Sequence, residues 1–222
     1  MRQGQVSMSK RRVRLYWALA GIVFVIIVAA ASAGPIMSHV EQPEYQVTAS
    51  FGSIEIRSYG PMIAAEAEMK GERKAAISEG FRLIATYIFG SNSPNAKIEM
   101  TAPVQQQRQQ KIAMTAPVTQ QADGDSWTVR FIMPHSWTME TLPAPTDARI
   151  KLVPIPAKRM VAIRFSGTAN DNLIEAKTAE LRRYAAEQKL LTVGEPVLAF
   201  YNPPWTLPFL RRNEIMLELA ST

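Results

Sequence analysis

The octapeptide Lys97-Ile98-Glu99-Met100-Thr101-Ala102-Pro103-Val104 returns as Lys111-Ile112-Ala113-Met114-Thr115-Ala116-Pro117-Val118, with Glu99 against Ala113 as the single difference. Each copy alternates Ile, Met, Ala and Val with Lys, Glu or Ala, Thr and Pro, which is the period of a half-buried β-strand. The six residues between the copies are five glutamines and one arginine. They have nothing apolar to bury, so the repeat predicts two strands of one sheet, joined as a hairpin across a polar loop.

Composition limits the chemistry. The chain has 222 residues, 47% of them hydrophobic, which is enough for one substantial core and an appendage. It contains no cysteine. This absence excludes disulfide bonds, a CxxCH haem attachment, thiolate ligation of haem, an iron–sulfur cluster and a cysteine nucleophile.

The positive charge is concentrated at the N-terminus. The net charge is +6, but five of the 25 basic residues lie within residues 1–14, and no acid precedes Glu41. The rest of the chain, with 20 basic and 19 acidic residues, is nearly neutral. This distribution argues against nucleic-acid binding and predicts that residues 1–14 are a cytoplasmic, basic topology signal.

Residues 15–33 carry no charge and are almost wholly apolar up to Ala30. As a helix, the apolar stretch would be about 28 Å long, close to the thickness of a hydrocarbon core. With Tyr16 and Trp17 as interfacial anchors, it predicts a single-pass transmembrane helix in the cytoplasmic (inner) membrane, with the domain on the periplasmic side. Alternatively, Ala31-Ser32-Ala33 is a signal-peptidase site and the segment is cleaved.

Residues 34–44 read as a tether, and a single folded domain is expected over residues 45–220. In its first half, alternation predicts strands and a 3.6-residue stripe predicts a helix that Gly90 ends. The expected elements are strands at Tyr45–Tyr59 and Pro61–Met69, a helix at Glu72–Phe89, the two octapeptides, and a strand at Trp127–Met133.

The second half repeats this layout about 96 residues later. Ile150–Val153 and Met160–Gly167 correspond to the strands that begin at Ile54 and Ile63. A helix at Asp171–Lys189 follows, with Asn170 or Asp171 as its N-cap, and then strands at Pro196–Asn202 and Asn213–Leu219. The pattern predicts a pseudo-twofold α+β domain, with a mostly antiparallel, barrel-like sheet flanked by two helices.

The KIxMTAPV segment resembles the signature of the SOUL family of haem-binding proteins. Five further segments match that family in order over roughly residues 41–219. They are residues 81–92 (FRLIATYIFGSN), 131–134 (FIMP), 142–145 (LPAP), 165–167 (FSG) and 208–215 (PFLRRNEI). The resemblance implies the same α+β fold and noncovalent binding of haem or a related tetrapyrrole at a hydrophobic surface site around the first helix and nearby loops.

Within that implied site, the candidate haem contacts on the first helix are Ile77, Phe81, Ile84 and Ile88, with burial in the core as the alternative. An apolar, proline-rich loop adds Trp205, Leu207 and Phe209. Arg211 and Arg212 either pair with the haem propionates or make a structural ion pair with an acid such as Glu214.

His135 is the candidate iron ligand, with a solvent-facing loop histidine as the alternative. The only other histidine, His39, lies in the tether. Met100 and Met114 suggest either a copper(I) site or packing on the apolar side of their strands. We expect packing.

These features favour a membrane-tethered, extracytoplasmic protein that sequesters or transfers haem without turnover. One alternative is a general binding module for other planar or amphipathic ligands. Another is an enzyme that degrades haem or removes its iron, for which the sequence offers no catalytic constellation. A third is a scaffold whose Trp205 loop docks a partner protein.

Overall fold

We analysed a computed structural model that describes residues 17, 40–93, 111–203 and 205–220. The first octapeptide, residues 97–104, lies outside the described residues. So does the predicted span 15–33, apart from Trp17. In the described part of the chain, no helix has the length and apolar character needed to cross a membrane.

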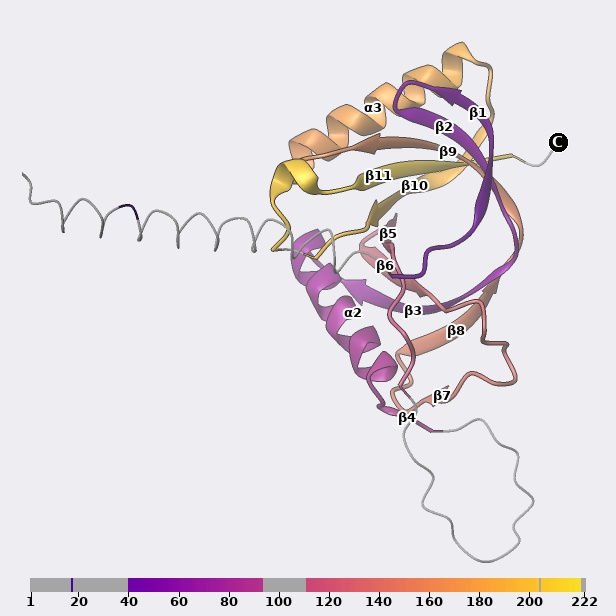
Figure 1. Cartoon of the computed structure of the whole chain (residues 1–222), viewed down its shortest axis with the longest axis vertical. Helices are drawn as coiled ribbons and strands as arrows, with labels where there is room; N and C mark the ends of the chain where they lie inside the picture. The colour runs from indigo at the N-terminus through magenta and orange to yellow at the C-terminus, as the bar shows by residue number, and fades with distance from the viewer. Residues whose placement is uncertain (1–16, 18–39, 94–110, 204, 221–222) are drawn as a thin grey trace, which may run out of the picture.

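The domain is built on one nine-stranded antiparallel sheet, in the order β1-β2-β9-β11-β10-β5-β6-β3-β8 (Figure 1). Its strands are β1 (Tyr45–Phe51), β2 (Ile54–Tyr59), β3 (Met62–Lys70), β5 (Val118–Asp123), β6 (Ser126–Ile132), β8 (Ile150–Ile155), β9 (Lys158–Phe165), β10 (Thr192–Phe200) and β11 (Asn213–Leu219). A second sheet pairs β4 (Asn92–Ser93) with β7 (Ala144–Pro145). The large sheet curls but is not closed, because β1 and β8 remain its two edges. The expected barrel-like sheet is therefore an open one.

The pseudo-twofold arrangement is confirmed by the strand order. The first unit is β2, β3, helix α2 (Arg73–Ile88), β5 and β6, and the second is β8, β9, helix α3 (Asp171–Glu187), β10 and β11. Exchanging the two units reverses the order of these strands, with β5 and β10 as central neighbours. β2 pairs with β9, and β3 with β8, so each unit completes its sheet with strands of the other.

Two predictions about strands are wrong. The expected strand Tyr45–Tyr59 is a hairpin, because Gly52 adopts a positive φ of 58° and turns the chain between β1 and β2. The second octapeptide is not a strand over Lys111–Pro117, and only Val118 enters β5. Thr115 instead forms an isolated parallel bridge with Glu41. Met114 is exposed, so the expected packing of its side chain is also wrong.

Both predicted helices are present, and capping residues mark the beginning of α3 and the end of α2. The Asn170 side chain accepts a hydrogen bond from Leu173 N and caps α3. After α2, Gly90 has a φ of 121°, and the amides of Gly90 and Ser91 donate to the carbonyls of Tyr87 and Thr86. This is the Schellman arrangement that terminates helices at glycine.

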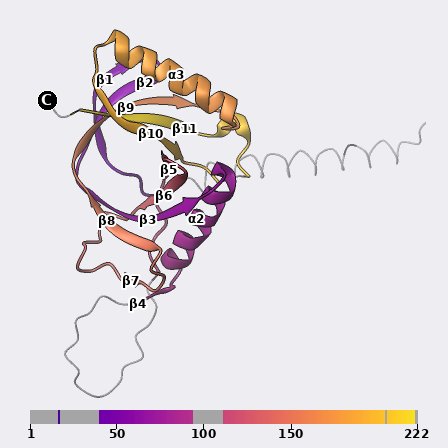
Figure 2. The ribbon, with the colours of Figure 1, turned by 180° about the vertical axis from the view of Figure 1, so that it is seen from behind.

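The helices cover the outside of the curled sheet, one over each half (Figures 1 and 2). Strand alternation divides the side chains between two faces. α2 packs on residues such as Ala65 and Phe131, and α3 on Val161 and Ile215. The opposite, inner face carries a third cluster that includes Tyr59, Met160, Val197, Tyr201 and Met216. The small chamber and the ionic network described below belong to this inner face.

The contact between α2 and β6 leaves no room for a side chain at Gly80. A Cβ there would lie 2.8 Å from Cγ2 of the fully buried Val129. We expect Gly80→Ala to lower the free energy of unfolding by about 1 kcal/mol, since overpacking outweighs the gain in helix propensity. Gly60→Ala is the matched control, because its Cβ would meet no atom within 4 Å. Urea denaturation followed by circular dichroism measures both, and equal stability of the two variants would contradict the expectation.

Candidate functional site

A cleft of about 1050 Å³ opens beside the β2–β3 and β8–β9 turns. Its walls are the entering segment Glu41–Gln46, the β2–β3 turn, the end of β8, and the loop that follows β6. The lining is largely apolar and aromatic, and it includes Tyr45, Tyr59, Pro61, Met62, Ile63, Ile132, Met133, Pro134, Trp137, Pro154, Ile155 and Pro156. Its size lies slightly above the roughly 300–1,000 Å³ that small-molecule and cofactor sites usually occupy.

A histidine–carboxylate pair lies in the wall of this cleft. His135 Nδ1 is 2.8 Å from Glu41 Oε1, and the His135 amide donates to the same oxygen at 2.7 Å. The imidazole is 87% exposed. Because Glu41 engages Nδ1, Nε2 is the nitrogen left for an outside partner. A histidine that ligates a metal usually has its other ring nitrogen held by a carboxylate or carbonyl in this way.

The second octapeptide positions this pair. Glu41 is held by its bridge to Thr115, and its carbonyl accepts a hydrogen bond from the Ala116 amide at 2.9 Å. The buried Thr115 hydroxyl donates to the Ile132 carbonyl at the end of β6. The segment therefore links the entering chain to the strand that leads to His135.

Each partner shifts the pKa of the other. The hydrogen bond and charge of Glu41 raise the pKa of His135 above its usual 6.5. Burial alone would raise the pKa of Glu41, but the amide and ring of His135 lower it below 4.5. For the histidine, whose pKa is raised on folding, the stabilisation is complete below its unfolded pKa and is lost as the pH rises through the folded pKa.

We expect Glu41→Gln to return the pKa of His135 towards 6.5, because the principal charge and acceptor are removed. A pH titration of the histidine Cε1 protons by NMR measures this, and the chain has only two histidines to assign. Glu44→Gln is the matched control, since Glu44 makes the smallest of the contributions that raise the His135 pKa. An unchanged His135 titration in Glu41→Gln would contradict the pairing.

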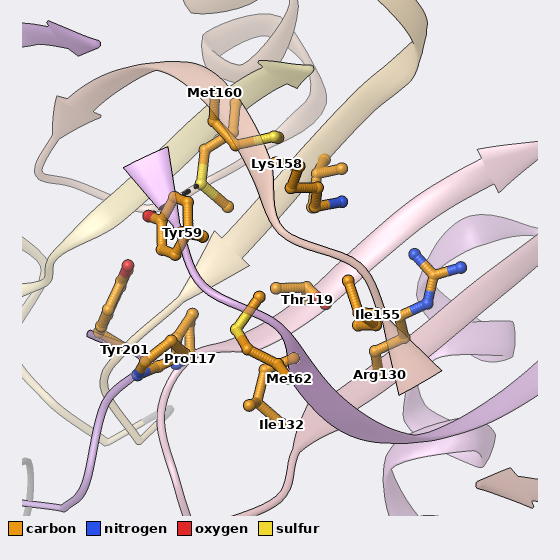
Figure 3. A pocket seen from close by; sticks show the side chains of 13 residues that line it. Tyr59, Met62, Pro117, Thr119, Arg130, Ile132, Ile155, Lys158, Met160 and Tyr201 are labelled. Carbon is orange, nitrogen blue, oxygen red and sulfur yellow. Dashed lines mark hydrogen bonds between the residues drawn. The ribbon is translucent and has the colours of Figure 1, made fainter. Parts of the chain in front are cut away.

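A chamber of about 60 Å³ lies deeper on the inner face and shares Tyr59, Met62, Ile132 and Ile155 with the cleft. Figure 3 shows Lys158 and Arg130 on one side of it and Tyr201 on the other. Lys158 pairs with Glu218 at 3.2 Å, and Arg130 with Glu66 at 2.6 Å. Both cations are thus held in the sheet by ion pairs.

A buried ionic network lies beside the cleft. Arg57 donates to both carboxylate oxygens of Glu214, at 2.6 and 3.1 Å, and the two side chains are almost completely buried. Arg212 Nη2 lies 2.8 Å from Glu214, and the Tyr201 hydroxyl donates to Glu214 at 2.9 Å. Burial would raise the pKa of Glu214, but the two guanidinium groups hold it below its usual value.

The site residues predicted from the sequence do not form one cluster in the structure. On α2, Ile84 and Ile88 are fully buried in the core, Ile77 is partly buried against it, and Phe81 is half-exposed on Phe131. For Ile84 and Ile88, the alternative of burial in the core is therefore the one that the structure shows. The α2 residues lie on the outer face of the sheet, so the structure does not bring them to the cleft.

Trp205, Leu207 and Phe209 are exposed on the loop before β11, and none of them lines the cleft. Arg211 Nε donates to the Thr206 carbonyl within this loop. Arg212 makes the structural ion pair with Glu214 that the sequence offered as an alternative. Of the predicted residues, the structure brings His135 into the cleft wall and Arg212 beside it, through contacts with Gln42 and Tyr45.

Sequence reasoning missed Glu41, which it assigned to the tether, and Trp137 and Ile155. The signal available for Trp137 was its place two residues after His135. Nothing local distinguished Glu41, because its contact with His135 joins residues 94 positions apart.

No group of three or more metal-ligating His, Asp or Glu side chains occurs within the described ranges.

Comparison with known proteins identifies the family. The model of the family described as SOUL heme-binding protein matches residues 40–218. No curated protein sequence matches the chain.

Solved structures share the architecture at low sequence identity. The EcmrR C-terminal domain is 13% identical, with a TM-score of 0.53, and the match covers 80% of this chain and 99% of that one. A hydrolase from Listeria innocua is 15% identical, with a TM-score of 0.50, covering 78% and 94%. An uncharacterized conserved protein from Listeria innocua is 16% identical, with a TM-score of 0.50, covering 76% and 92%. At these identities, the likeness shows the fold alone.

Proposed function

The chain belongs to the SOUL heme-binding protein family, and we propose that it binds haem or a related tetrapyrrole noncovalently in the cleft beside His135. The observation that carries this proposal is the Glu41–His135 pair in the wall of a cleft of about 1050 Å³. A flat apolar ligand needs such a platform, and a neutral imidazole nitrogen is one of the groups that ligate haem iron.

The residues of the cleft fit this ligand. Tyr59, Met62, Trp137 and Ile155 supply apolar and aromatic surface on several sides. His135 Nε2 would hold the iron, and Glu41 orients the imidazole ring through Nδ1. No lysine or arginine is among the described residues that line the cleft. Bound haem would supply iron for ligand exchange or electron transfer, and the protein groups orient and shield it.

Binding is noncovalent in this proposal because the chain has no cysteine for a thioether attachment. We further propose that residues 15–33 tether the domain, at residues 45–220, to the outer side of the cytoplasmic membrane. The basic residues 1–14 and the apolar run support this topology. A tethered, exported binder is suited to sequestering haem or passing it to a partner.

A binding role is favoured over an enzymatic one. A serine-dependent mechanism needs a hydroxyl that hydrogen-bonds to the histidine base. In the described part of the chain, the His135 ring has Glu41 as its hydrogen-bond partner and no serine or threonine hydroxyl. Haem degradation remains an alternative that a turnover assay with bound haem would reveal.

The experiment is a haem titration of the fragment Pro35–Thr222, which contains all strands of the nine-stranded sheet. Optical absorption should show saturable one-to-one binding with a shifted Soret band. Trp137→Leu, in the cleft, should weaken binding by about tenfold, while Trp205→Leu, on the exposed loop, should not change it. The reverse result would place haem at the loop instead. Nonspecific partitioning, or equal competition by other planar amphiphiles, would favour the general binding module.

A further inference from the structure

We propose that the loop Asn202–Arg212 inserts its apolar side chains into the interface of the membrane to which the domain is tethered. The observation is an exposed patch of Trp205, Leu207, Phe209 and Leu210, four large apolar side chains within six residues. Trp205 is 61% exposed and Phe209 is 70% exposed. Such a concentration on a folded surface marks an interaction site. This inference rests on the membrane tether of the proposed function.

The loop is held rigidly although its side chains face outward. Leu210 N donates to the Leu207 carbonyl at 2.9 Å, within a 3-10 turn at Pro208–Leu210. Gly167 N donates to the Pro208 carbonyl at 2.8 Å, which ties the turn to the connection between β9 and α3. Thr206 is buried beneath it, and its carbonyl accepts from Arg211 Nε at 2.7 Å. These bonds fix the turn on the protein, and its apolar side chains remain exposed.

The entering chain lies beside this loop. Arg212, at the end of the loop, donates to Asn202 through its amide and to Gln42 through Nη1, at 2.6 and 3.1 Å. Arg212 also reaches the Tyr45 hydroxyl at 3.4 Å. The chain therefore enters the domain next to the patch. Only residues 34–41 separate the proposed span, residues 15–33, from Gln42, a reach of about 30 Å even if fully extended.

A bilayer is the partner that these features fit. The short connection keeps the loop near the membrane surface, and tryptophan with leucine and phenylalanine is the composition found at bilayer interfaces. The tether makes insertion effectively intramolecular, so a few exposed side chains suffice. Haem partitions into membranes because of its apolar ring, and the loop is linked through Arg212 to Gln42 and Tyr45 of the cleft wall.

The test uses the full chain in phosphatidylcholine–phosphatidylglycerol vesicles. The natural chain has no cysteine, so Phe209→Cys and the control Leu191→Cys each carry a single site for an environment-sensitive NBD label. Leu191 is 76% exposed and follows α3, about 25 Å from the end of that helix nearest the loop. We expect the label at position 209 to have a roughly fivefold lower iodide-quenching constant than at 191, and to be quenched by spin-labelled lipid.

Flotation of the same vesicles separates the inference from the tether on which it rests. A floating protein with label 209 open to iodide would overturn the loop insertion and leave the tether standing. A protein that does not float would overturn both. Protection from iodide without quenching by spin-labelled lipid would mean that a protein surface or a second copy covers the patch, and would also overturn the inference. Haem titration of the fragment remains a separate readout of the binding function.

Discussion

Replacing Glu214 with glutamine is expected to lower the free energy of unfolding by about 3–5 kcal/mol. The carboxylate lies between Arg57 and Arg212, and Arg57 and Glu214 are each 1% exposed. Glutamine keeps the volume but leaves the buried Arg57 charge with the partly exposed Glu55 as its remaining carboxylate partner, 2.8 Å from Arg57 Nε. Urea denaturation of the Pro35–Thr222 fragment, followed by circular dichroism, measures the loss.

The matched control is Glu218→Gln, the same substitution on the same face of β11. Glu218 is partly exposed and pairs with Lys158 at 3.2 Å, so the expected loss is below about 1 kcal/mol. The combined replacement of Arg57 by Met and Glu214 by Leu should recover much of the stability, because it removes both buried charges. Equal losses in the two single variants would contradict the assignment of a buried pair.

Glu214 also makes the stability of the folded protein depend on pH in the acid range. The pKa of Glu214 is lowered in the folded protein, so its stabilising contribution is present above the unfolded pKa, near 4.5, and is lost as the pH falls through the lowered value. The difference in stability between the natural chain and Glu214→Gln should therefore shrink as the pH drops below about 4.5. A constant difference down to the acid transition would contradict the shift.

Replacing His135 with alanine is expected to remove the histidine-ligated haem spectrum and to weaken haem binding by more than about 100-fold. Loss of an outer partner such as Glu41 typically costs 10–100-fold in metal affinity, and loss of the ligand itself costs more. Because the side chain is 87% exposed, its removal should leave the fold intact. Absorption titration and circular dichroism measure these two effects separately.

His39→Ala is the control, as it removes the other histidine of the chain. It should change neither the spectrum nor the affinity. Added imidazole should restore the ligated spectrum in His135→Ala, since the vacated position is open to solvent. An unchanged spectrum in His135→Ala would show that the iron is not bound by this residue, while the cleft variants would still report where the ring lies.

Much of the architecture was predictable because it depends on local periodicity. Both helices, their caps at Asn170 and Gly90, and most strands of the two units follow from apolar spacing and terminal residues, whereas β5 was not predicted. The offset between Ile54 and Ile150 predicted the pseudo-twofold relation that the strand order confirms. The turn at Gly52 was overlooked, although Gly-Ser between two apolar runs is a known hairpin signal.

The strand prediction for the second octapeptide failed for a tertiary reason. Alternation shows which side chains prefer burial, and Ile112 and Ala116 are indeed buried. It does not supply a strand partner. Over Lys111–Pro117 the chain instead runs along the entering segment, where Thr115 meets Glu41. Ile112 and Ala116 are therefore buried although this segment is not hydrogen-bonded as a strand of the sheet.

The sequence by itself determined the fold class, the two-unit layout, the family, and the exclusion of cysteine chemistry, because these depend on residue types and their spacing. It also identified His135 and the apolar Trp205 loop as residues of interest. Only the tertiary structure decided that His135 is joined to Glu41 in a cleft, that Arg212 belongs to the Glu214 network, and that Ile84 and Ile88 are core. These outcomes depend on contacts between residues far apart in the chain, and short-range periodicity carries no information about which distant side chain becomes a neighbour.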